Sequence, residues 1–121
     1  MATFQGGPQV LGTAQTGNVN TAGGQYVAAS DASRTPAVII TSTIGATPTV
    51  TANIQGSVDG TNWYNIPYSL VATPTTYVLT AITITTAVTT LYQLQGLQAW
   101  QYCRVAYTAN TNVTLTTTLY A

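Results

Sequence analysis

The segment Asn53–Pro67, NIQGSVDGTNWYNIP, contains the clearest structural signal in this chain of 121 residues. Residues typical of strands stand on both sides of the dipeptide Asp59-Gly60. Asp-Gly between two such runs indicates a hairpin, because glycine supplies the positive φ that a primed turn needs. The segment therefore predicts a strand, a tight turn and a second strand opening with Trp63, whose ring we expect to close one end of a β-sandwich.

The rest of the chain shows the same preference for strands. Between Asn112 and Tyr120, Val113, Leu115 and Leu119 alternate with threonines, which is the pattern of a strand with one buried face. We find no helical period, and turn residues separate the runs, which predicts an all-β antiparallel β-sandwich that could take jelly-roll form. The predicted strands are Gln25–Ser30, Ala37–Ile44, Thr49–Ser57, Trp63–Pro67, Thr76–Thr85, Val88–Leu94, Trp100–Thr108 and Asn112–Tyr120.

Residues 1–24 differ in composition from the rest of the chain. They hold six of the ten glycines and few large apolar residues, which predicts an extended, irregular N-terminal arm before a sandwich domain over residues 25–121. Such an arm buries too little surface in its own chain to offset the entropy lost on ordering. We therefore expect it to lie on a neighbouring subunit.

The chain carries almost no charge. Two basic residues, two acidic residues and no histidine make 3% of the sequence and a net charge of zero, whereas about 25% is usual. General acid–base catalysis and zinc sites draw on side chains that are nearly absent, and nucleic-acid binding needs a basic surface. The composition predicts a protein that is not an enzyme, with no catalytic residues, no cofactor, no metal and no nucleic-acid partner.

The sequence also bears on the compartment in which the protein is made. No stretch has the length of about 18 apolar residues that a membrane span needs, and the start of the sequence resembles no secretion signal. Cys103 is the one cysteine, so no intrachain disulfide can form and a small buried hydrophobic residue is expected there. We expect a protein made in a host cytoplasm without a membrane partner.

An uncharged surface also predicts association. Twenty-six threonines and 45% hydrophobic residues take the place of charged side chains. Without like-charge repulsion such a surface tends to bind neighbours. We therefore expect a homo-oligomer within a larger assembly.

The stretch GSVDGTNWYNI (56–66), followed by WQYCRVAYT (100–108) and NVTLTTTLYA (112–121), resembles the small β-sandwich virion proteins of tailed bacteriophages. The resemblance spans residues 49–121. It implies a structural virion protein, either a capsid decoration or cement protein that contacts the major capsid protein and copies of itself, or a neck or tail component. Discoidin-like sandwiches share the DGxxW turn, which leaves a carbohydrate or cell-surface binding module as the alternative.

The residues singled out for structure or interaction are Asp59, Gly60, Trp63, Trp100 and Arg104. Arg104 is expected either to pair with Asp59 or to lie over a neighbouring tyrosine of its own strand. Asp59 is expected to accept hydrogen bonds within its own turn, because one carboxylate makes a poor calcium site. In the binding-module alternative, stacking platforms would come from Trp63, Tyr64, Tyr68 or Trp100.

Overall fold

The structure is a computed structural model that describes residues 8–21, 24–25, 36–94 and 100–120. Within these ranges every regular element is a β-strand, all pairings are antiparallel, and no helix could cross a membrane. The predicted all-β antiparallel fold class is confirmed. The strands are β1 (Pro8–Gln15), β2 (Val19–Asn20), β3 (Gly24–Gln25), β4 (Ala37–Ser57), β5 (Tyr64–Asn65), β6 (Tyr68–Leu70), β7 (Thr73–Val78), β8 (Ile82–Ile84), β9 (Thr89–Leu94) and β10 (Tyr102–Tyr120).

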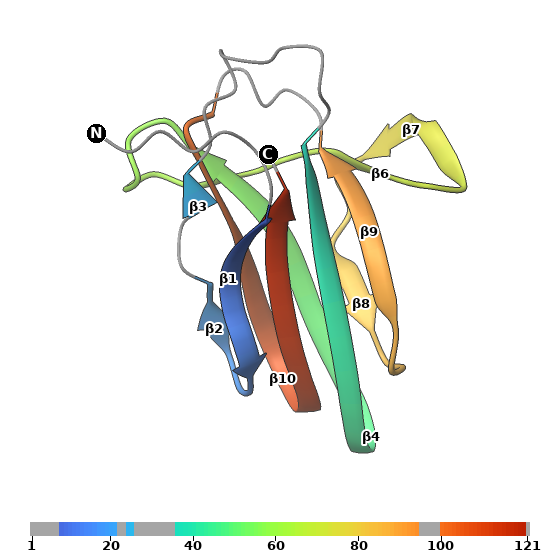
Figure 1. Cartoon of the computed structure of the whole chain (residues 1–121). Coiled ribbons are helices and arrows are strands. Elements are labelled where there is room, and N and C mark those ends of the chain that lie inside the picture. Colours follow the sequence, from blue (N-terminus) through green and yellow to red (C-terminus); the bar gives the residue numbers. More distant parts are fainter. Residues whose placement is uncertain (1–7, 22–23, 26–35, 95–99, 121) are drawn as a thin grey trace.

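Two long strands, β4 and β10, make the frame of the molecule. They pair along their whole length, from Tyr102 opposite Ser57 to Tyr120 opposite Ala37. Each strand runs to one end of the molecule, folds back and returns, so that one continuous sheet forms two facing layers (Figure 1). The predicted strands 37–44 and 49–57 are thus two halves of β4, and 100–108 and 112–120 fall largely within the two halves of β10.

The fold-backs depend on residues with left-handed backbone. In β4 the residue is Thr47 (φ 44°), and in β10 the residues are Ala109 (φ 51°) and Asn112 (φ 55°). Non-glycine residues adopt this region rarely, and asparagine adopts it most readily. At these residues the chain changes direction, but β4 and β10 stay paired on both sides of the bend. The composition of the turns had predicted that each strand would end there.

The core lies between the two layers. Val38 and Ile40 from the first half of β4 and Ile54 from the second half belong to one buried cluster. The two halves of β10 contribute Val105 and Leu115 to the same cluster. Alternate side chains of both layers therefore point inward, as the period of two in the sequence predicts.

The remaining strands extend this frame. The sheet order is β1-β10-β4-β9-β6-β7, with β2 and β3 paired to β10 and with β5 and β8 paired to β4. The hairpin of β6 and β7 continues from β9 and projects beyond the sandwich (Figure 1). The predicted strand 76–85 is split, because residues 79–81 lie outside any strand between β7 and β8.

The N-terminal segment is more regular than its composition predicts. Pro8–Gln15 forms β1 against the second half of β10 of the same chain, with register shifts on both sides of Gly12. Leu11 is buried in the core cluster. The buried Leu11 and the backbone pairing with β10 therefore order this strand. Hydrophobic periodicity alone does not reveal it. Residues 1–7 and most of the predicted strand Gln25–Ser30 lie outside the described residues.

Candidate functional site

The turn after β4 is closed by Asp59. Its Oδ1 accepts hydrogen bonds from the backbone N–H groups of Thr61 (2.8 Å) and Asn62 (2.9 Å) and from the Ser57 hydroxyl (3.0 Å). Its Oδ2 accepts one from Asn62 Nδ2 at 2.8 Å. The Asn62 and Thr61 backbone donors, then the side chains of Asn62 and Ser57, hold the pKa of Asp59 well below its usual range. Asp59 thus has the turn-forming role that the sequence predicts.

Gly60 provides the positive φ of this turn, at 77°. The hairpin predicted around it forms between β4 and β5, with Gln55 opposite Asn65 and Gly56 opposite Tyr64. Its loop is longer than a two-residue primed turn, because the Asp59 carboxylate organises several residues beyond the glycine.

Arg104 does not pair with Asp59. Its Nε donates to Gln55 Oε1 at 2.9 Å, and Gln55 Nε2 donates to Asn65 Oδ1 at 3.2 Å. The guanidinium lies over the Trp63 ring, 4.3 Å from its centroid. Partial burial lowers the pKa of Arg104. The predictions of an Asp59 partner and of a tyrosine under Arg104 are both wrong, because the register places Gln55 directly opposite Arg104 and the turn occupies the Asp59 oxygens.

Trp63 and Trp100 lie in different surroundings. Trp100 packs against the core cluster, and a Cβ on Gly56 would come within 2.8 Å of its ring. Tyr64 lies beside Trp100, with ring centroids 5.9 Å apart. Trp63 stands directly before β5, and its ring lies under the Arg104 guanidinium and outside the core cluster. Trp63 therefore does not close the sandwich.

Gln55, Trp63, Asn65 and Arg104 together form what we call the Trp63–Arg104 patch. It joins three strands, with a half-buried indole ring, a guanidinium and two amide side chains held by mutual hydrogen bonds. Such groups bind through stacking and through hydrogen bonds to neutral polar partners. Among the described residues there is no group of three or more His, Cys, Asp or Glu that could hold a metal.

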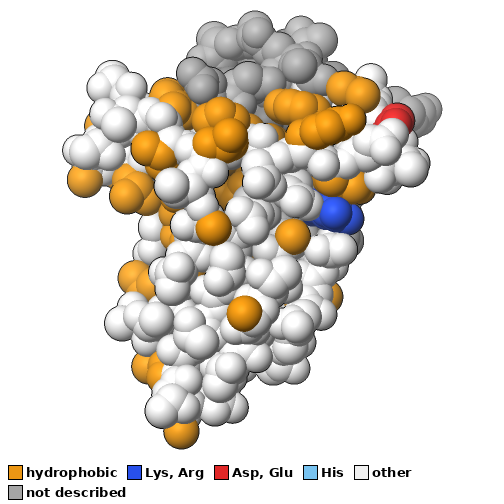
Figure 2. Space-filling view, turned by 180° about the vertical axis from the view of Figure 1, so that it is seen from behind, with side chains coloured by type: hydrophobic (Ala, Val, Ile, Leu, Met, Phe, Trp, Pro, Cys, Tyr) orange, Lys and Arg blue, Asp and Glu red, His pale blue; other side chains and the backbone are white. Residues whose placement is uncertain are grey.

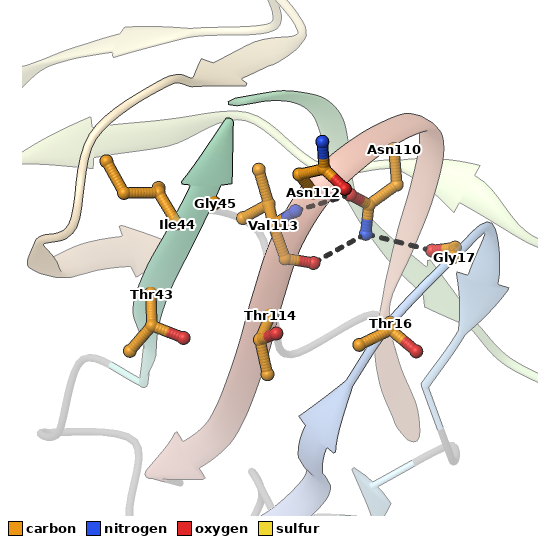
Figure 3. A pocket seen from close by; sticks show the side chains of 9 residues that line it. All are labelled: Thr16, Gly17, Thr43, Ile44, Gly45, Asn110, Asn112, Val113 and Thr114. Carbon is orange, nitrogen blue, oxygen red and sulfur yellow. Dashed lines mark hydrogen bonds between the residues drawn. The ribbon is translucent and has the colours of Figure 1, made fainter. Parts of the chain in front are cut away.

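A pocket lies at the opposite end of the molecule, where the long strands fold back (Figure 3). This bend pocket has a volume of about 450 Å³ and is lined by Thr16–Gly17, Thr43–Gly45 and residues between Asn110 and Thr114. Asn110 holds its rim: its Nδ2 donates to the carbonyls of Gly17 (3.1 Å) and Val113 (2.9 Å), and its Oδ1 accepts from the Val113 N–H (3.1 Å). Sequence reasoning missed this pocket, because the three segments that form it are distant along the chain.

The surface is otherwise uncharged and partly apolar. Asp59 and Arg104 are the two charged side chains of the described ranges, since Asp31 and Arg34 lie outside them. Figure 2 shows both at one side of a face on which hydrophobic side chains gather toward the end opposite the fold-backs. Large hydrophobic residues exposed in the described part include Val10, Val58, Tyr64, Val71, Leu79 and Val88.

Comparison with known proteins gives a match of fold. No family model and no curated protein matches this sequence. Among solved structures, the crystal structure of the SPBc2 prophage-derived protein YomS is similar, with a TM-score of 0.58 and 8% sequence identity. The alignment covers 100% of this chain and 98% of that one. The two chains therefore share a fold over their whole lengths.

Proposed function

We propose that this chain is a structural protein of a bacteriophage particle, a capsid decoration or cement protein that binds the major capsid protein and neighbouring copies of itself. The observation that carries the proposal is the surface, which exposes large apolar side chains and, over the described residues, two charges. Such a surface favours contact with other proteins over free solution. The fold shared with a prophage-derived protein supports the same setting.

The mechanism follows from this surface. Apolar side chains and threonines would be buried between subunits, and strand edges would supply backbone hydrogen bonds to partners. Few ion pairs can form, so the attachment should be insensitive to ionic strength. We expect high salt to leave the protein on its particle and mild denaturant to release it. Release by salt alone would contradict this mechanism.

The experiment that tests the proposal is quantitative mass spectrometry of purified native particles. A fixed ratio of this chain to the major capsid protein, at or near one copy per shell subunit or a simple fraction of it, would support a decoration or cement role. A few copies per particle would instead support a neck or tail position. Absence of the chain from particles would overturn the proposal.

One arrangement favours a second candidate, a carbohydrate or cell-surface binding module. The Trp63–Arg104 patch places a half-buried indole beside two fixed amides, a combination that suits a sugar ring. Titration with soluble cell-wall polysaccharide would then quench Trp63 fluorescence, and the variants Trp63→Ala and Asn65→Ala would lose binding. A matched change on the same face, Asn53→Ala, should leave binding intact.

A further inference from the structure

The hydrogen bonds within the Trp63–Arg104 patch all run in one direction. A guanidinium has donors only, so Gln55 turns its Oε1 toward Arg104 Nε, which donates to it at 2.9 Å. The Nε2 of Gln55 then faces Asn65 and donates to the Asn65 Oδ1 at 3.2 Å. The arginine therefore sets the orientation of both amides, and the Nδ2 of Asn65 stands at the far end of this chain of bonds as a donor.

The groups that remain for a ligand are donors as well. The two Nη groups of Arg104 and the Nδ2 of Asn65 have no hydrogen-bond partner among the described residues, whereas both amide oxygens already accept a bond. Asn65 is exposed and Arg104 is half-buried, and the blue atoms in Figure 2 show that the guanidinium reaches the surface. An ionised carboxylate only accepts hydrogen bonds, while a hydroxyl also donates. The patch therefore suits a carboxylate better than a neutral hydroxyl.

Arg104 also lacks a counter-charge within the described part of the chain. Asp59 is the one carboxylate there, and both of its oxygens accept hydrogen bonds from its own turn. The half-buried guanidinium is thus partly desolvated without an ion pair to offset the cost. A carboxylate brought by a ligand would supply that pair.

The guanidinium is oriented before any ligand binds. Its plane lies over the Trp63 ring, 4.3 Å from the centroid, and its Nε is held by Gln55. The two Nη groups therefore form the edge that is left free. Such a fixed fork loses little side-chain entropy on binding, and it matches the two oxygens of a carboxylate.

We propose that the Trp63–Arg104 patch binds a carboxylate, supplied by an aspartate or glutamate side chain of the major capsid protein. This inference rests on the proposed function, because it names the chemical group to which the chain attaches. A second copy of the chain would offer only Asp59 from its described residues, and the oxygens of Asp59 are already used. The carboxylate therefore comes from a different protein.

Two features favour a protein over an acidic sugar as the source. Tryptophan and arginine are the residue types that most often carry the binding energy of protein interfaces. Val58, in the turn that leads to Trp63, is 53% exposed and offers an apolar contact that a protein surface can cover. A single, partly buried pair is screened less by salt than a surface pair, so this contact agrees with an attachment that ionic strength changes little.

Side-chain NMR resonances test the class of ligand. We would titrate the ¹⁵N-labelled protein with N-acetylglutamate methylamide and, at equal ionic strength, with its neutral counterpart N-acetylglutamine methylamide. We expect saturable shifts of the Arg104 Nε–H and Asn65 Nδ2 resonances with the first compound and not with the second. Equal shifts with both compounds, or no saturable shift, would overturn the proposal. Glucuronate provides the acidic-sugar arm, and tighter binding of glucuronate would overturn the assignment to a protein.

Substitutions locate the site. Arg104→Gln removes the charge and should weaken binding of the acidic compound about tenfold or more, and Arg104→Lys, which keeps the charge without the fork, should weaken it less. Asn65→Asp replaces the exposed donor with a like charge and should also abolish binding. Asn53→Ala, on the same strand as Gln55, is the matched control and should bind as the wild type does. Unchanged circular dichroism will confirm folding, and full binding by Asn65→Asp would overturn the proposal.

Re-attachment to particles separates this inference from the proposed function. We would release the protein from particles with mild denaturant, add back wild type, Arg104→Gln or Asn53→Ala, and expect Arg104→Gln alone to bind about tenfold more weakly. Equal re-attachment of all three would refute the carboxylate contact and leave the virion role standing. Saturable binding of the acidic compound by a chain that is absent from particles would refute the virion role and leave the carboxylate site standing.

Discussion

Tyr107 and Thr117, ten residues apart on β10, share a hydrogen bond of 2.5 Å between their hydroxyls in the buried core. The two residues belong to opposite halves of the strand, so this bond joins the two layers across the fold-back. Burial raises the pKa of Tyr107 above its ordinary value, and the phenol stays neutral. The alternation of the C-terminal strand places Thr117 on the inward face among leucines, and the tyrosine hydroxyl explains how a threonine is accommodated there.

Removing one partner of this pair should destabilise the protein. Tyr107→Phe leaves the buried Thr117 hydroxyl without a partner, and we expect the free energy of unfolding to fall by about 1–3 kcal/mol in urea denaturation. The double variant Tyr107→Phe/Thr117→Val removes both polar groups and should recover most of that loss. Tyr120→Phe, at an exposed site of the same strand, is the control. A double variant no more stable than the single one would contradict the assignment.

The fold-back of β10 predicts that an alanine-to-glycine substitution changes the free energy of unfolding in opposite directions at Ala109 and at Ala106. Ala109 has a φ of 51°, a region that costs a side chain about 1–2 kcal/mol and glycine almost nothing. Ala109→Gly should therefore raise the free energy of unfolding by up to about 1 kcal/mol, after allowance for the flexibility that glycine adds to the unfolded chain. Ala106→Gly, at a buried position of regular strand, should lower it by a similar amount. Chemical denaturation of both variants measures the difference, and equal effects would argue against a left-handed fold-back.

The stability of the protein should fall with acid through Asp59. The pKa of Asp59 is lower in the folded protein than its unfolded value of about 3.9. The ionised carboxylate therefore stabilises the fold fully above that value, and this stabilisation is lost as the pH falls further toward the folded pKa. We expect the urea midpoint to decrease below about pH 4 in the wild type and to depend less on pH in Asp59→Asn. An identical pH profile for the two proteins would show that the turn does not depend on the charge.

Arg104 should protect the Trp63 ring from solvent. Arg104→Leu removes the guanidinium above the indole, and we expect stronger acrylamide quenching of tryptophan fluorescence and a loss of about 0.5–1 kcal/mol of stability. Thr108→Leu changes an exposed residue of the same strand and should alter neither quantity. Unchanged quenching in Arg104→Leu would show that the ring is covered by other groups.

The sequence by itself determined the all-β fold class, the alternation of buried and exposed positions, the positive φ of Gly60, the turn-closing role of Asp59 and the uncharged surface. These properties depend on the residue type and on neighbours a few positions away, and so a single sequence predicts them.

Only the tertiary structure decided the partner of Arg104, the position of Trp63 outside the core, the strand at Pro8–Gln15 and the bend pocket. Each depends on which residues face each other across strands that are distant in the chain. The decisive element is the pair of fold-backs at Thr47 and Ala109, because they convert one long hairpin into two layers. The contacts of the core that they close offset the conformational cost of their left-handed backbone. These contacts join residues that are distant in the sequence, so local sequence patterns do not predict them.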